Sequence, residues 1–176
     1  MLWVGAFGVI AICAYAYFKS LEKVYQLSFL PKGLAPSKVV YVKEESLGFG
    51  PGGNETGVIV YELPEGVSNE IQQVGINYLT RMPRQNKAGR DWRGIYEHWQ
   101  PTPILVEGTD SSMNRVMSHN IANYLDRYGF GIEIDPQIEQ EINNAISTPG
   151  SFAAYGRIGL IIVIPKVNKV VYVYNG

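Results

Sequence analysis

The sequence predicts an α+β protein, in which a single N-terminal transmembrane helix precedes one domain with a mostly antiparallel sheet and about three helices. Residues 2–18 carry no charged side chain, which is typical of a membrane-spanning helix. Runs rich in β-branched and aromatic residues come in neighbouring pairs, as in β-hairpins. Between these pairs, apolar residues recur at helical spacing. Strand pairs separated by helical segments indicate an α+β domain.

The uncharged run 2–18 predicts that the protein sits in a membrane as a single-pass protein, with the lipid bilayer as a partner. At about 1.5 Å per residue the run covers about 25 Å, close to the thickness of a hydrocarbon core of roughly 30 Å. Trp3 lies near one end and Phe18 near the other, where aromatic side chains meet the bilayer interface. Its many small residues would allow packing against other membrane proteins.

Three other interpretations of this run stay open. A cleaved signal peptide is suggested by Ala14-Tyr15-Ala16, although no basic leader precedes the apolar run. A lipoprotein signal would need a small residue before the modified cysteine, whereas Cys13 follows Ile12. A buried core helix has a suitable length, but a run that is apolar on all sides is more typical of lipid.

The predicted organisation is an anchor at 1–18, a juxtamembrane neck at 19–36 and an α+β domain at 37–176. Basic residues follow the anchor and none precedes it, which favours a cytoplasmic domain, although a tail of this length can be translocated regardless of charge. The only cysteine lies in the anchor, so the domain depends on apolar packing and not on disulfides.

The domain's elements follow from local patterns. Strands are predicted at 38–45 and 57–63, around a glycine-rich loop that precedes a strand and so does not resemble a phosphate-binding loop. A helix is predicted from a cap at Ser68 or Asn69 to Met82, and another from the polar residues 109–112 to Tyr128. The remaining expected elements are short strands at 105–106 and 132–134, a helix capped by Asp135 and ending before Thr148, a central strand at 157–164, and a strand at 169–174 nearer an edge.

One segment of the domain has the composition of a contact surface. Residues 81–99 combine basic side chains with aromatic ones, a combination that suits anionic lipid headgroups, a phosphate-bearing ligand or an acidic partner. The competing interpretation is an ordinary loop with solvated arginines and with tryptophans packed into the core. The candidate binding residues are Arg81, Arg84, Lys87, Arg90, Trp92, Arg93, Tyr96 and Trp99.

No motif in the sequence names a reaction, a metal or a cofactor. His98 and His119 are the only histidines and neither has ligand-like spacing to other metal-binding residues. The alternative function is therefore that of an enzyme, a membrane-tethered hydrolase. In it His98 would transfer protons, and Glu97 or Asp91 would orient the His98 ring.

The function that the sequence predicts first is a membrane-anchored interaction or assembly component, such as an accessory subunit of a membrane complex. A formal charge of −1 and a pI near 6.1 argue against a nucleic-acid binder, whose affinity would fall steeply with salt.

Overall fold

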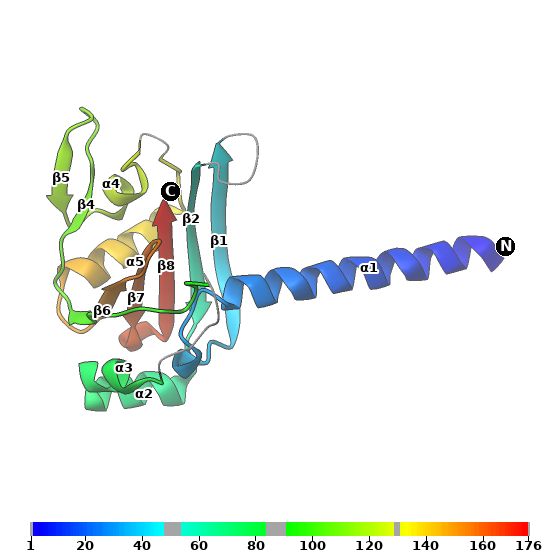
Figure 1. Ribbon diagram of the computed structural model, residues 1–176, viewed down its shortest axis with the longest axis horizontal. Coiled ribbons are helices and arrows are strands. Elements are labelled where there is room, and N and C mark those ends of the chain that lie inside the picture. The colour runs from blue at the N-terminus through cyan, green and yellow to red at the C-terminus, as the bar shows by residue number, and fades with distance from the viewer. Residues whose placement is uncertain (1, 48–53, 84–90, 129–130, 176) are drawn as a thin grey trace.

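The chain forms one long helix that leads into a layered α+β domain (Figure 1). The computed structural model describes residues 2–47, 54–83, 91–128 and 131–175, and within them the side chains of all but 2–11, 47 and 54. The α-helices are α1 (Leu2–Leu27), α2 (Glu65–Val74), α3 (Ile76–Arg81), α4 (Ile121–Leu125) and α5 (Pro136–Ser147), and the short 3₁₀ helices are η1 (Lys32–Leu34) and η2 (Pro165–Val167). The strands are β1 (Lys38–Leu47), β2 (Asn54–Glu62), β3 (Gln100–Pro101), β4 (Val106–Thr109), β5 (Arg115–Ser118), β6 (Phe152–Tyr155), β7 (Leu160–Ile164) and β8 (Lys169–Asn175).

Six strands form one antiparallel sheet in the order β1-β2-β8-β7-β6-β3, and β4 pairs with β5 as a separate hairpin. The α+β class and the antiparallel sheet predicted from the sequence are therefore confirmed, as are the β1–β2 pair and the C-terminal β7–β8 pair. The prediction that 169–174 lies near an edge was wrong, because β8 lies between β2 and β7. Its tyrosines pack their rings into the core, where their hydroxyls find partners.

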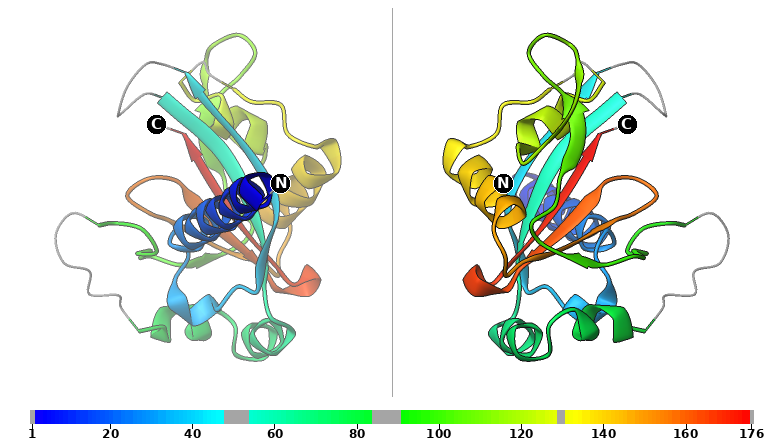
Figure 2. Two further views of the ribbon diagram at one scale, coloured as in Figure 1. Left: turned by 90° about the vertical axis from the view of Figure 1, so that its right-hand side faces the viewer. Right: turned by 90° about the vertical axis from the view of Figure 1, so that its left-hand side faces the viewer.

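Both faces of the sheet are covered, so the domain has two cores (Figure 2). Alternation along β2 sends Val58 and Val60 to one face and Ile59 and Tyr61 to the other. The first face packs against α4, α5 and β4, and we call this the helix-side core. The second face packs against the segment that follows α1, against helices α2 and α3, and against residues 92–99. We call this the neck-side core.

Helix α1 projects from the domain past the outer strand β1, and Figure 2 shows it end-on. From Ile12 to Tyr25 its described side chains are exposed. Among the residues that the structure describes, no helix combines the length and the apolar character needed to cross a membrane. The predicted anchor thus has no support from this search, and the side chains of residues 2–11, on which much of that prediction depends, lie outside the described ones.

The helix predicted from 109–112 to Tyr128 was wrong. The polar residues read as its cap instead form the turn of the β4–β5 hairpin, because the Asp110 carboxylate accepts hydrogen bonds from the backbone N–H groups of Ser112 and Asn114, both at 2.9 Å. Only α4 remains helical in this region, with the Asn120 side chain accepting from the N–H of Ala122.

Two further expectations need correction. The single helix predicted to end at Met82 is divided at Gly75, whose φ of 69° interrupts it, and its first part begins after Pro64 and not at Ser68 or Asn69. This division is one reason why the described domain has four α-helices after α1 where about three were expected. Residues 132–134 form no strand, although Ile132 and Ile134 are buried. The cap at Asp135 is confirmed, since its carboxylate accepts from Gln137 and Ile138.

A row of three residues joins the neighbouring strands β1, β2 and β8. Glu44 on β1 lies opposite Gly57 on β2, and Gly57 lies opposite Tyr174 on β8. The absence of a side chain at Gly57 lets Tyr174 lie across β2, so that its hydroxyl donates to the Glu44 carboxylate at 2.5 Å. A Cβ on Gly57 would lie 2.6 Å from the Tyr174 ring.

We therefore expect Gly57→Ala to lower the free energy of unfolding by about 1–3 kcal/mol, because the ring must move and its hydrogen bond weakens. Gly66→Ala is the matched control: a Cβ there meets nothing within 4 Å, and alanine favours the helix by up to about 1 kcal/mol. Urea denaturation of both variants measures the difference. Equal effects would show that Tyr174 does not depend on the space above Gly57.

Candidate functional site

The most elaborate contacts of the described residues surround the point where α1 joins the domain. Residues 26–34, which we call the neck root, lie on the neck-side core. Phe29 stacks on Tyr172, with ring centroids 4.8 Å apart and planes inclined by 15°, and it also contacts the rings of Trp92 and Tyr25. The neck root is therefore part of the folded domain and not a loose spacer.

Three tyrosine hydroxyls donate hydrogen bonds to backbone carbonyls of the neck root. Tyr61 donates to Gln26 at 2.8 Å, Tyr78 to Gly33 at 2.9 Å and Tyr96 to Phe29 at 2.9 Å. The three donors come from β2, from α3 and from the segment 91–99, so elements far apart in the sequence hold the same stretch of chain. We call these three hydrogen bonds the tyrosine clasp.

Glycine at position 94 lets the segment 91–99 lie directly on the neck root. Gly94 is buried and has a φ of 71°, and a Cβ there would lie 2.7 Å from the Leu30 carbonyl oxygen. The left-handed backbone and the close approach both require glycine.

The predicted binding residues fall into three groups. Arg84, Lys87 and Arg90 lie outside the described residues. Arg81 ends α3 and is exposed. Arg93 is about one-third exposed, with its Nε 2.9 Å from the Asp91 carboxylate and its guanidinium 5.5 Å from the centre of the Tyr25 ring.

The aromatic members of the predicted surface point into the domain. Trp92, Tyr96 and Trp99 are partly buried against the neck-side core, as the loop interpretation of this segment expects. Binding by the segment as a whole stays a prediction, because three of its five Lys and Arg residues lie outside the described part.

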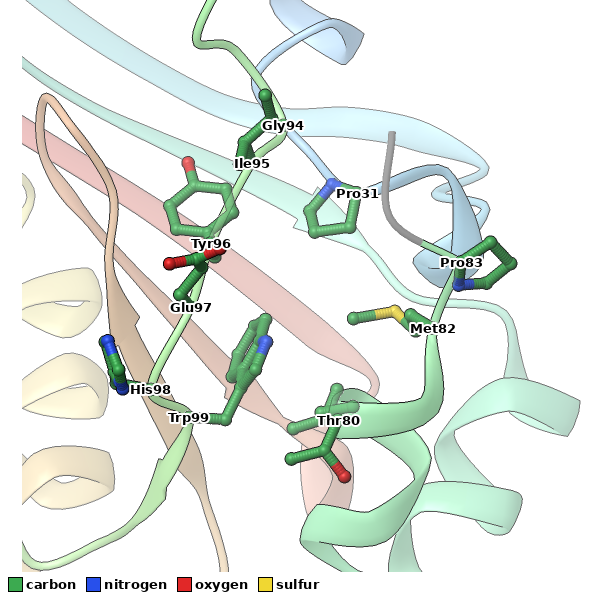
Figure 3. A pocket seen from close by; sticks show the side chains of 11 residues that line it. Pro31, Thr80, Met82, Pro83, Gly94, Ile95, Tyr96, Glu97, His98 and Trp99 are labelled. Carbon is green, nitrogen blue, oxygen red and sulfur yellow. The ribbon is translucent and has the colours of Figure 1, made fainter. Parts of the chain in front are cut away.

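A cleft of about 490 Å³ opens beside the neck root (Figure 3). The neck contributes Pro31, and the remaining wall is formed by residues 94–99. The end of α3 and the residues after it contribute Leu79, Thr80, Met82 and Pro83. In Figure 3 the Met82 side chain extends from the end of α3 toward the side of the cleft formed by Trp99.

The alternative catalytic residues border this cleft without forming a catalytic group. Glu97 and His98 are exposed, and no hydrogen bond joins His98 to a carboxylate or hydroxyl within the described part of the chain. Asp91 contacts Arg93. The hydrolase therefore stays a prediction that this geometry does not favour. Among the described residues, no three His, Cys, Asp or Glu side chains lie close enough to hold a metal ion.

Tyr61, Tyr78 and Phe29 were not among the residues singled out from the sequence, although they organise the site. Tyr61 lies in a predicted strand and Tyr78 on the apolar stripe of a predicted helix, so the sequence pattern indicates only that both are core residues. The available signal was the high number of tyrosines, 12 in 176 residues, in a chain with six phenylalanines. Tyrosine in a core needs a hydrogen-bond partner for its hydroxyl.

Burial raises the pKa of several tyrosines in the neck-side core. Loss of solvation is the main cause for Tyr61, Tyr96, Tyr172 and Tyr174, and the hydrogen bond and negative charge of Glu44 raise the pKa of Tyr174 further. Each of these hydroxyls therefore keeps its proton in the folded state at a pH where an exposed tyrosine has lost it.

Comparisons with known proteins give this site no family context: no family model matches the chain, and neither the curated proteins nor the solved structures contain a match.

We expect Gly94→Ala to destabilise the domain more than Gly75→Ala does, by at least about 1 kcal/mol. Both glycines have a φ near 70°, where an L side chain is strained, but a Cβ on Gly75 meets nothing within 4 Å. The excess destabilisation of Gly94→Ala thus reports the contact with Leu30. If the two variants lose equal stability, the segment 91–99 does not press on the neck root.

We also expect the domain to unfold in alkali. Below about pH 10 these tyrosines are protonated in both the folded and the unfolded states, so their contribution to the free energy of unfolding does not change with pH. Above that pH the unfolded chain loses protons that the folded domain retains, and stability falls by about 1.4 kcal/mol per pH unit for each such tyrosine.

Absorbance at 295 nm follows tyrosine ionisation, and circular dichroism follows unfolding, in the same titration. The expected result is that a large share of the tyrosines ionises only as the fold is lost. Ionisation of all tyrosines near pH 10 with the fold intact would contradict their burial.

Proposed function

We propose that this protein is a single-pass membrane-anchored interaction or assembly component, with α1 inserted in a lipid bilayer. The observation that supports this best is the row of large apolar side chains along the projecting helix. Their exposed fractions lie between 46% and 69%, although α1 is joined to a well-packed domain. The row comprises Ile12, Tyr15, Tyr17, Phe18, Leu21, Val24 and Tyr25.

Exposed apolar side chains in this number need a cover. Soluble proteins rarely leave large contiguous apolar surfaces in water, and such surfaces mark contacts with membranes or with other proteins. The sequence before Lys19 is uncharged, so a bilayer can accept this part of α1 without desolvating an ionic group. After Lys19 the helix carries Glu22, which pairs with Lys19 at 3.2 Å, and Lys23, as expected of a segment at the interface.

The tyrosine clasp supports a defined orientation of the domain. From Phe18 to Leu27 the helix covers about 13 Å, so the neck root would lie just beyond the headgroups. Because the neck root is fixed to the sheet, the domain would keep the same side toward the lipid. A component that presents a surface to other membrane proteins benefits from such a fixed orientation.

The partner-binding part of the proposal rests on basic residues near the neck. Arg81 is exposed, and Arg93 is partly exposed beside α1. Together with the neighbouring basic residues of the sequence they would attract anionic lipid headgroups or an acidic partner protein.

Insertion of α1 can be tested by flotation of the full-length protein with vesicles in high salt, which removes purely electrostatic binding. Neutral pH is needed, because the alkali of a carbonate extraction would lower the stability of the domain through its buried tyrosines. We expect the wild type to float. Ile10→Asp places a charge in the middle of the uncharged run and should make the free energy of insertion less favourable by about 2.5–3.5 kcal/mol, so that this variant floats poorly.

Val24→Asp is the matched control, since Val24 is 64% exposed on the same helix but lies beyond Lys19. It should float like the wild type. Recovery of the wild type at the bottom of the gradient would refute the anchor, and an amino terminus that begins after Ala16 would identify a cleaved signal peptide instead.

A further inference from the structure

Aromatic side chains form much of one wall of the cleft beside the neck root. The rings of Tyr96 and Trp99 have centroids 6.2 Å apart and are inclined by 51°, so they meet at an angle and do not stack. Pro31, Leu79 and Met82 provide an apolar lining across from them. A concave site of several hundred Å³ in which apolar and aromatic side chains are combined with polar groups has the size and make-up of a small-molecule site.

Glu97 is the acidic side chain that this cleft presents. It lies between the two aromatic residues in the chain and is exposed, and it has no ion pair or hydrogen bond within the described part of the protein. Some other carboxylates of the domain are neutralised by ion pairs: Lys169 pairs with Glu141 and Lys38 pairs with Glu62. Lys32 and Arg81 adjoin lining residues in the chain but do not line the cleft.

The backbone turns sharply at this point. His98 has a φ of 55°, a left-handed conformation that non-glycine residues rarely adopt. All residues from Gly94 to Trp99 line the cleft, and this turn lies among them, between Glu97 and Trp99. The cleft thus combines two aromatic rings and a carboxylate without an ion pair, all from one short irregular segment.

We propose that this cleft binds a small organic ammonium ion. The cation lies against Tyr96 and Trp99, whose π-electrons attract positive charge, and Glu97 supplies the opposite charge. Quaternary ammonium groups suit such a site, because they are weakly hydrated and large enough to touch both rings. A free ammonium compound and the headgroup of a choline phospholipid offer the same chemistry.

The test uses two probes of the same shape: choline and 3,3-dimethylbutan-1-ol, in which carbon replaces the charged nitrogen. Saturation-transfer NMR with full-length protein in a maltoside detergent reports binding of each, whether or not α1 inserts in a bilayer. We expect the neutral alcohol to bind at least about fivefold more weakly than choline. Equal binding of the two probes, or no saturation transfer to choline, would overturn the proposal.

Two substitutions locate the site. Glu97→Gln and Trp99→Leu should each weaken choline binding several-fold, whereas Glu133→Gln, which removes an exposed carboxylate outside the cleft, should not. Because Glu97 is exposed, its variant should keep the wild-type melting temperature, so it decides the question even if Trp99→Leu proves unstable. Choline binding that survives both substitutions would place the cation elsewhere and refute the assignment.

Competition identifies the natural source of the ammonium group. Vesicles of phosphatidylcholine that displace choline, when vesicles of phosphatidylglycerol do not, indicate a lipid headgroup. Displacement by neither indicates a soluble ammonium compound. Both results support the cation site, since choline binding through Glu97 has then already been shown.

Discussion

The architecture depends on satisfying the backbone carbonyls at the end of α1 while that end is buried. The last carbonyls of any helix lack partners within the helix, and burying them without donors costs about 1–3 kcal/mol each. Here the chain leaves α1 directly over the sheet, where water is excluded. A tyrosine suits this position, because its ring fills apolar space and its hydroxyl can donate a hydrogen bond to a backbone carbonyl. The backbone N–H of Phe29 donates to the Gln26 carbonyl at 3.3 Å, and the Tyr61 hydroxyl is a second and closer donor to it. Two residues beyond the helix, the Tyr96 hydroxyl donates to the Phe29 carbonyl.

The two faces of the sheet are covered in different ways for the same reason. Helix α5 shields the helix-side core with its own backbone hydrogen bonds complete, so aliphatic side chains such as Ile142 and Ile146 suffice. The neck-side core is covered by α2 and α3 and also by irregular chain, whose backbone groups need side-chain donors. Its tyrosines meet this need, because Tyr61, Tyr78 and Tyr96 donate to carbonyls of the neck root.

Sequence patterns predicted most of the sheet because strand signals are local. The runs at 38–45 and 57–63 and the two C-terminal runs all became strands. Where prediction failed, a local pattern had two physical uses. The Asp110 carboxylate can cap a helix or close a hairpin turn, and only the pairing of β4 with β5 selects the turn. The apolar stripe up to Met82 gave no sign that Gly75 would adopt a positive φ and divide the helix.

The site was harder to predict because its contacts join distant positions. Tyr96 and the Phe29 carbonyl are 67 residues apart, and Tyr61 and the Gln26 carbonyl are 35 apart. The composition of residues 81–99 marked the segment as unusual. Composition alone, however, does not show whether an aromatic side chain faces the core or the solvent. Trp92 and Tyr96 face the neck root because Gly94 lets the chain approach it, a constraint that appears only once both segments are in place.

The direction of α1 also bears on the most vulnerable part of the sheet. Among the described strands, β1 pairs only with β2 and so forms an edge of the sheet. The exposed Val40 and Val42 lie on this strand, and such edges invite pairing with another chain. Lys43, paired with Glu45 at 2.7 Å, places charge along this edge. α1 leaves the domain past the same strand, so in the proposed orientation the edge faces the bilayer at close range (Figure 1). The clasp that fixes the helix would then protect the edge as well, because no second sheet could approach it without displacing lipid.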